Sequence, residues 1–418
     1  MPPAADIGWQ LECQACRARF SVSAMLRGCP DCAARGQISL LELQRRLPLS
    51  PAPLSARTGR GLTRWLDLLP VADPDAWFSL GEGGTALVRS RIIGRRLGLP
   101  NLYFKLEQQN PTFSFKDRFV AITVNAARAF GYRRVVVSST GNLALSVAAY
   151  AAAAGMACVV IVPHGVPPGI AAEAALYGAR VAVIAPELRF QALEAAAGCA
   201  GWFPVGLFLR RRVQNAFGVE GYRSFAYEIV EELGEAPGAV LFPCARGNGL
   251  YGAWKGFLDC RALGWTTRMP RMIAAQPEGA NSLEMSLVRN TGEALELPPV
   301  RSVAKSTSES VAGDDALRAI RQSGGTALSA DDDAIRQAVA ALGEEGLNAE
   351  SGAALPVACL PKLLDGEKID RDAVLVCVLT AAGLRWPEQA DWIRPQALAV
   401  QDIAAFTDFL NADGANAR

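Results

Sequence analysis

The chain has 418 residues, of which 50% are hydrophobic and 20% are charged. This composition excludes a disordered protein and allows a large buried core. A net charge of +1 gives no overall field that would favour nucleic acid or an anionic membrane. Residues 1–20 lack the apolar core of a signal peptide. The apolar run at 143–163 contains polar residues and a glycine turn, which fit a helix followed by a buried strand better than a membrane span.

The ten cysteines fall into two groups. Four of them follow the spacing C-x2-C, twelve residues, C-x2-C: Cys13, Cys16, Cys29 and Cys32. Two such pairs supply the four thiolates that tetrahedral zinc requires, and four sulfur ligands leave no open position, so the predicted metal is structural. A vestigial or disulfide-linked knuckle is the alternative. The other six are scattered, mostly in apolar runs, and resemble free thiols of a reducing compartment, the cytoplasm. We therefore predict a zinc-ribbon-like module over residues 1–45.

From residue 46 onward, apolar runs of strand length alternate with segments of helical length. The predicted strands are 133–139, 158–163, 180–184, 239–242 and 373–379. The predicted helices include 144–154 and 169–177. Continuous apolar strands that alternate with helices are typical of α/β proteins whose parallel sheets are covered on both faces. The sequence therefore predicts an α/β fold for residues 46–418.

One lysine lies in an unusual setting, within the segment Asn110–Arg118 of sequence Asn-Pro-Thr-Phe-Ser-Phe-Lys-Asp-Arg. Lys116 follows a Pro turn, has aromatic neighbours and precedes a predicted helix. Surroundings of low polarity depress the pKa of a lysine and free its amine to attack a carbonyl. Lys116 is therefore a candidate to form a Schiff base with pyridoxal phosphate (PLP). A Ser-Lys hydrolase using Ser114 is a weak alternative. The single histidine, His164, is predicted to lie in a loop and gives no support to a hydrolytic triad.

Two strand ends carry polar residues of the kind that bind ligands in α/β proteins. The segment 139–142, Ser-Thr-Gly-Asn, offers hydroxyls, an amide and helix N-terminal N–H groups that suit a carboxylate. An ordinary helix cap is the alternative there. Thr380 follows a later apolar strand. Its hydroxyl is a candidate to bind a ligand only if a heterocycle lies above it, and otherwise it is an ordinary cap of the strand end.

A glycine-rich segment, Ala-Arg-Gly-Asn-Gly-Leu-Tyr-Gly at 245–252, follows another predicted strand. Its glycines let the backbone approach an anion, and the next helix adds the positive end of its dipole. The segment also fits G-x-G-x-x-G, and Glu278 follows the next apparent strand, so dinucleotide binding is an alternative to phosphate binding.

Taken together, these segments resemble the threonine synthase branch of the fold-type-II PLP-dependent enzymes, in the tryptophan synthase β superfamily. The segment 79–87 is similar to the family's G-E-G-x-T-P-L, and 110–118 to its N-P-T-x-S-F-K-D-R. The segment 139–142 matches its S-T-G-N loop, and 379–384 its L-T-G-H-G-L. The resemblance extends from Cys13 to about Trp386.

The resemblance implies two parallel-type α/β subdomains, the smaller at about 115–215, and a homodimer. It implies a catalytic role for one residue, Lys116. The implied cofactor contacts are Phe115, Lys116, Asn142, Gly247, Asn248, Gly249 and Thr380. The implied contacts of the substrate carboxylate are Ser139, Thr140 and Gly141.

The resemblance also implies a small amino-acid substrate and elimination or replacement at its Cβ or Cγ, with a leaving group of the O-phosphohomoserine type. A β-replacement enzyme similar to cysteate synthase, an ammonia-lyase, and a non-catalytic binding protein are the alternatives. The chain departs from the family pattern with larger or more apolar residues, which predict a divergent substrate pocket. These departures are Phe113, Phe119, Leu143, Ala381 and Ala382.

Overall fold

The computed structural model describes residues 8–46, 49, 53–209, 212–366, 369–392 and 401–413. The chain divides into two compact units, residues 1–385 and 386–418. The second unit contains the helix α15 (Ile403–Asp413) and a 3-10 segment, η7 (Pro387–Trp392). Among the described helices, none combines the length and apolar character that crossing a bilayer requires. All further elements belong to the first unit.

A three-stranded antiparallel sheet in the order β2-β1-β3 forms the N-terminal module. Its elements are β1 (Trp9–Cys13), β2 (Arg19–Phe20), the short helix α1 (Pro30–Ala33) and β3 (Leu41–Arg45). Trp9, Leu11 and Leu43 of this sheet share one hydrophobic core with the α/β region that follows. The module therefore packs directly on the rest of the unit.

The larger sheet has six strands in the order β14-β13-β12-β15-β5-β4, and all neighbours are parallel except β4 and β5. The strands are β4 (Leu87–Arg89), β5 (Leu102–Leu106), β12 (Ala239–Pro243), β13 (Arg271–Pro277), β14 (Thr326–Ala330) and β15 (Leu375–Leu379). Alternate residues of β12 enter different cores: Val240 and Phe242 lie in one, and Ala239 and Leu241 in the other. Because successive side chains of a strand point to opposite faces, this division shows that both faces are covered.

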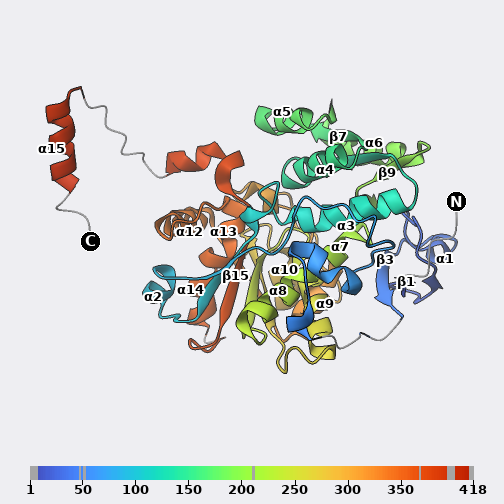
Figure 1. The fold of residues 1–418 in the computed structure, drawn as a ribbon, viewed down its shortest axis with the longest axis horizontal. Coiled ribbons are helices and arrows are strands. Elements are labelled where there is room, and N and C mark those ends of the chain that lie inside the picture. The colour runs from blue at the N-terminus through green and yellow to red at the C-terminus, as the bar shows by residue number, and fades with distance from the viewer. Residues whose placement is uncertain are drawn as a thin grey trace. The chain divides into compact units, whose positions relative to one another are not determined.

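Helices cover the two faces of the larger sheet in separate groups (Figure 1). The first group is α7 (Gly218–Gly221), α8 (Ser224–Leu233), α9 (Asn248–Ala262), α10 (Ser282–Val288) and α11 (Asp314–Gln322), and α3 (Lys116–Ala129) packs against α7. The second group is α2 (Ile93–Leu97), α12 (Asp332–Glu344), α13 (Ser351–Ala358) and α14 (Leu360–Asp365).

The smaller sheet has four parallel strands in the order β8-β7-β6-β9. Its strands are β6 (Arg134–Ser138), β7 (Ala157–Pro163), β8 (Arg180–Ile184) and β9 (Trp202–Pro204). The helices α4 (Asn142–Ala153), α5 (Pro168–Leu176) and α6 (Arg189–Gly198) lie beside it at the top of Figure 1. A hairpin of β10 (Leu207–Leu209) and β11 (Arg212–Gln214) follows.

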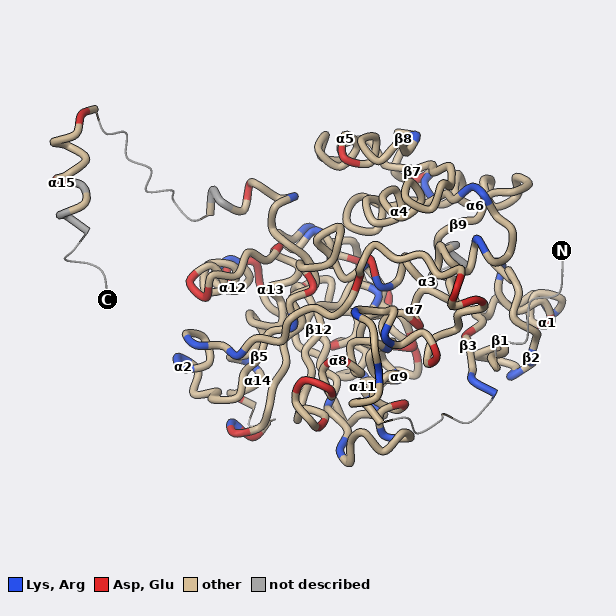
Figure 2. The backbone as a smooth tube through the Cα atoms, viewed as in Figure 1, with Lys and Arg blue, Asp and Glu red and all other residues tan. Residues whose placement is uncertain are grey.

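The predicted α/β fold is confirmed, and the predicted strands correspond to β6, β7, β8, β12 and β15. The apolar run at 143–163 forms α4 and β7, as expected, and His164 lies in an exposed turn. Lys and Arg are interspersed with Asp and Glu along the same elements (Figure 2). The division of residues 46–418 into two subdomains, the smaller near 115–215, stays a prediction.

Candidate active site

Lys116 is the first residue of α3, and the backbone just before it is fastened to the end of β15. The N–H of Phe115 donates to the carbonyl of Thr380 at 2.9 Å, and the N–H of Ala382 donates to the carbonyl of Phe113 at 3.0 Å. These bonds bring Thr380, which is buried, beside the lysine segment. Two motifs that are more than 260 residues apart in the sequence therefore meet at one place.

The Lys116 side chain is half-buried and lies over the ring of Phe115, with Nζ 4.4 Å from the ring centroid. Burial lowers the pKa of Lys116 to about 8, although the carboxylates of Glu350 and Glu309 act in the opposite direction. A substantial fraction of the amine is therefore neutral at mildly alkaline pH, and the neutral amine is the form that attacks a carbonyl.

Two glycines of the predicted phosphate loop pack closely against neighbouring groups. A Cβ atom at Gly249 would lie 2.9 Å from the ring of Phe115, which in turn stacks on Tyr222 with centroids 5.1 Å apart. Gly247 has a φ of 80°, and a Cβ atom there would lie 2.3 Å from that of Ala316. Both positions therefore require glycine, and Phe115 joins the phosphate loop to Lys116.

The start of α9 has the character of an anion site. The N–H groups of Asn248 and Gly249 in its first turn have no acceptor within the described residues, and no side chain caps this end of the helix. Free N–H groups and the positive end of the helix dipole favour a phosphate group. An anion site and a nucleophilic amine, joined through one aromatic ring, fit PLP.

The predicted carboxylate loop connects β6 to α4. Gly141 is the N-cap of α4, and its N–H lies 3.4 Å from Ser139 Oγ, while Thr140 is exposed. The Asn142 side chain donates through Nδ2 to Glu350 Oε2 at 3.1 Å. Its Oδ1 accepts a hydrogen bond from Arg385 Nη1, also at 3.1 Å.

Glu350 and Arg385 are site residues that the sequence interpretation missed. Glu350 is 2% exposed, its N–H donates to the carbonyl of Ala381 at 3.0 Å, and its carboxylate acts to raise the pKa of Lys116. A lone acid at the start of the apolar helix Ser351–Ala358 was the available signal. Arg385 directly follows the segment 379–384, but nothing in its surroundings in the sequence distinguishes it from a surface arginine.

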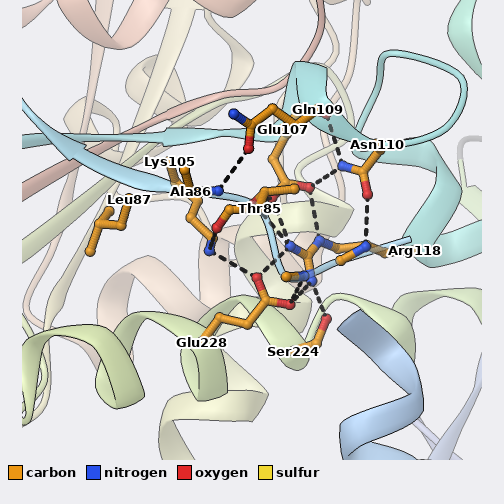
Figure 3. A network of polar contacts seen from close by, with 12 residues as sticks. Thr85, Ala86, Leu87, Lys105, Glu107, Gln109, Asn110, Arg118, Ser224 and Glu228 are labelled. Carbon is orange, nitrogen blue, oxygen red and sulfur yellow. Dashed lines mark hydrogen bonds and ion pairs between the residues drawn. The ribbon is translucent and has the colours of Figure 1, made fainter. Parts of the chain in front are cut away.

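Arg118 lies two residues from Lys116 but belongs to a separate, closed network (Figure 3). Its guanidinium makes bidentate ion pairs with Glu107 and Glu228, at 2.6–2.8 Å, and is fully buried. Ser224 and Thr85 accept further hydrogen bonds from it. All of its polar hydrogens are thereby engaged, so Arg118 fixes the start of α3 rather than binding a ligand.

The departures from the family pattern do not all lie near Lys116. Phe119, which the sequence suggested as part of a divergent pocket, is buried and occupies the space that a side chain at Gly218 would need. That interpretation was wrong, because Phe119 fills the core. Phe113 is 45% exposed, has a φ of 58° and lies 5.8 Å from the Arg385 guanidinium.

The four N-terminal cysteines converge, with all sulfur atoms within 4.8 Å of one another. The Cys13–Cys32 and Cys16–Cys29 sulfur pairs are each 3.7 Å apart. A tetrahedral Zn–S₄ site with bonds of about 2.3 Å has S–S edges of about 3.8 Å, so the geometry fits zinc. Burial raises the pKa of the Cys29 thiol, while hydrogen bonds from Ser39 and neighbouring backbone N–H groups lower that of Cys13.

Comparisons with known proteins place the chain in a family of PLP-dependent enzymes. The model of the family described as pyridoxal-phosphate dependent enzyme matches residues 78–381. The threonine synthase of Methanocaldococcus jannaschii is 34% identical over 79% of this chain and 82% of its own. That of Methanosarcina acetivorans is 30% identical over 91% of this chain and 93% of its own.

The solved structure of an L-serine ammonia-lyase from Rhizomucor miehei has the same fold. Its TM-score is 0.64 at 18% identity, over 75% of this chain and 98% of its own. The family match covers more than half of the chain, and the threonine synthases match it over most of their length. The chain therefore belongs to the PLP-dependent enzymes of fold type II, as a divergent relative of the threonine synthases.

Proposed function

We propose that this protein uses PLP attached to Lys116 to act on a small amino acid, eliminating or replacing a leaving group at Cβ or Cγ. The observation that carries the proposal is the convergence of Lys116, Thr380 and the Gly247–Gly249 loop around Phe115. When bound, PLP supplies an electron sink conjugated with the substrate Cα.

The residues have separate roles in this proposal. Lys116 Nζ holds the cofactor and then moves the proton at Cα, a task suited to an amine whose pKa is near 8. The first turn of α9 binds the phosphate, and the loop Ser139–Gly141 binds the substrate carboxylate. Asn142 would donate to the phenolic oxygen of the cofactor. Thr380 would serve the pyridine nitrogen, where a neutral hydroxyl would not enforce ring protonation and so would favour elimination or replacement.

The relatives named threonine synthase support an O-phosphohomoserine-type substrate. A specific observation favours a second candidate, a β-replacement enzyme or ammonia-lyase. Three arginines that lie next to the predicted site residues are each paired with acids: Arg118 with Glu107 and Glu228, Arg246 with Glu309, and Arg385 with Glu173. A neutral or singly charged leaving group needs no such arginine.

Two measurements test the function. Exchange of the substrate α-proton in D₂O, followed by NMR, reports Lys116 action whatever the leaving group, and Lys116→Ala should abolish it. Release of phosphate, acetate or ammonia from O-phosphohomoserine, O-phosphoserine, O-acetylserine and serine then identifies the reaction. A protein that binds PLP but exchanges no α-proton in any of these amino acids would instead be a non-catalytic binding protein.

We also propose that Cys13, Cys16, Cys29 and Cys32 hold a structural Zn²⁺ in a module comprising residues 1–45, with the catalytic region at 46–418. The fit of the sulfur distances supports this assignment. The purified protein should contain about one equivalent of zinc per chain, and Cys13→Ser should lower it. Less than about half an equivalent in the parent protein, with no change in the variant, would contradict the site.

We further infer a cytoplasmic homodimer. Five buried cysteines outside the module are free thiols, which a reducing compartment preserves: Cys158, Cys244, Cys260, Cys359 and Cys377. The dimer rests on the resemblance to the family. Sedimentation of the purified protein at several concentrations tests it, and a monomer at all of them would contradict it.

A further inference from the structure

Arg385 joins three segments that surround Lys116. It lies in the 3-10 segment η6 (Gly383–Arg385), and its side chain is only 8% exposed. Nη1 donates to the carbonyl of Thr112 at 2.8 Å and to Asn142 Oδ1 at 3.1 Å. Nε and Nη2 make a bidentate pair with Glu173 of α5, at 3.1 and 2.8 Å. One guanidinium thus binds the segment 110–118 that contains Lys116, the segment 139–142 that ends in Asn142, and a helix beside the smaller sheet.

The Asn142 carboxamide is held at both of its polar atoms. Its Nδ2 donates to the Glu350 carboxylate while its Oδ1 accepts from the Arg385 guanidinium. A carboxamide rotated by half a turn would place its NH₂ against a cation and its oxygen against an anion. Both contacts would then be repulsive, so the pair of charged neighbours selects one orientation.

We propose that Arg385 is a positioning residue that fixes the orientation of Asn142, and so determines which atom of that side chain meets the cofactor. The proposal rests on the function given above, in which Asn142 donates to the phenolic oxygen of PLP. Nδ2 carries two hydrogens, and Glu350 takes one of them, which leaves one for the cofactor. Without Arg385 the carboxamide loses the partner of its oxygen and can turn its acceptor towards the cofactor.

Glu173 acts on this arrangement through Arg385. It accepts two of the four hydrogen bonds of the guanidinium and comes from α5, which packs beside α4. Bidentate carboxylate pairing fixes the plane of an arginine side chain, and lysine cannot reproduce it. The orientation of Asn142 is therefore linked to the position of α5.

The test is a double-mutant cycle read by PLP affinity, with the apoprotein titrated with PLP and followed by visible absorbance. Arg385→Met should weaken PLP binding about 5- to 30-fold, the value of one or two hydrogen bonds. Asn142→Ala should weaken it to a similar extent. Combined with Asn142→Ala, Arg385→Met should cause little further loss, because its effect passes through Asn142.

Arg385→Lys keeps the positive charge and should fold even if Arg385→Met does not. It should still lose most of the PLP affinity that Arg385→Met loses, because a lysine lacks the planar guanidinium that bonds Glu173 and Asn142 together. Arg336→Met is the matched control, because it removes an exposed ion pair with Asp333. Independent losses that multiply in the double variant, or unchanged affinity in both Arg385 variants, would overturn the inference. If the parent apoprotein takes up no PLP, the proposed function itself fails, which is a distinguishable outcome.

Discussion

Two cations near the start of α3, Lys116 and Arg118, lie in opposite electrostatic surroundings. Arg118 is fully buried between Glu107 and Glu228, which raise its pKa despite the cost of burial, and in return the pKa of Glu228 falls to about 2 (Figure 3). Lys116 has an aromatic ring beside its amine, and burial lowers its pKa to about 8. A buried cation that is paired with carboxylates stays charged and is structural, whereas a buried cation beside an aromatic ring has a lowered pKa and is reactive, even when the two lie in the same motif.

The largest effect is expected from removing the reactive cation. Lys116→Ala should abolish covalent attachment of the cofactor and lower activity by about 10³-fold or more. Its free energy of unfolding as apoprotein should not fall, because no ion pair of Lys116 is found within the described residues and the variant loses the cost of burying an ammonium group. Visible absorbance and denaturant unfolding check the two parts. A strongly destabilised Lys116→Ala protein would show that Lys116 is a structural cation, as Arg118 is, and would contradict the contrast between them.

Removing the compensated cation should have the reverse effect. Arg118→Met leaves Glu107 and Glu228 buried without their main partner, which should lower the free energy of unfolding by about 3–5 kcal/mol. Urea unfolding of the apoprotein measures this, with Arg336→Met expected to stay within about 1 kcal/mol of the parent. A loss below about 1 kcal/mol for Arg118→Met would mean that the network contributes little.

The pKa of Lys116 predicts a pH dependence. Covalent uptake of PLP by the apoprotein should rise with pH and reach half its maximal rate near pH 8. The unfolded chain binds this proton more tightly, with an ordinary pKa of 10.5, so the free energy of unfolding should rise between about pH 8 and 10.5. That rise should be absent from Lys116→Met. Glu350→Gln should move the midpoint of uptake lower, since Glu350 favours the ammonium form.

Local patterns in the sequence were enough to predict the strands and the cysteine cluster. The four cysteines lie within 20 residues, so their spacing alone determines that they can converge. The partners of Asn142 could not be predicted in this way, because Glu350 and Arg385 follow it by 208 and 243 residues. Phe119 shows the opposite error: it lies close to Lys116 in sequence, yet the helix turns its side chain into the core against Gly218.

The smallest effect is expected at Phe113, which lies on the Lys116 side of the comparison. Its φ of 58° is unfavourable for a residue with a side chain, and its ring is exposed beside Arg385. Phe113→Gly removes about 1 kcal/mol of backbone strain but adds freedom to the unfolded chain, so a net stabilisation of about 0.5 kcal/mol is expected. Phe113→Ala keeps the strain and loses the ring, so it should be less stable than Phe113→Gly. Equal free energies of unfolding for the two variants, measured in urea, would show that the backbone at position 113 is not strained. A more stable Phe113→Gly protein would show that Phe113 lowers the stability of the chain, and we would then expect its ring to contact the substrate.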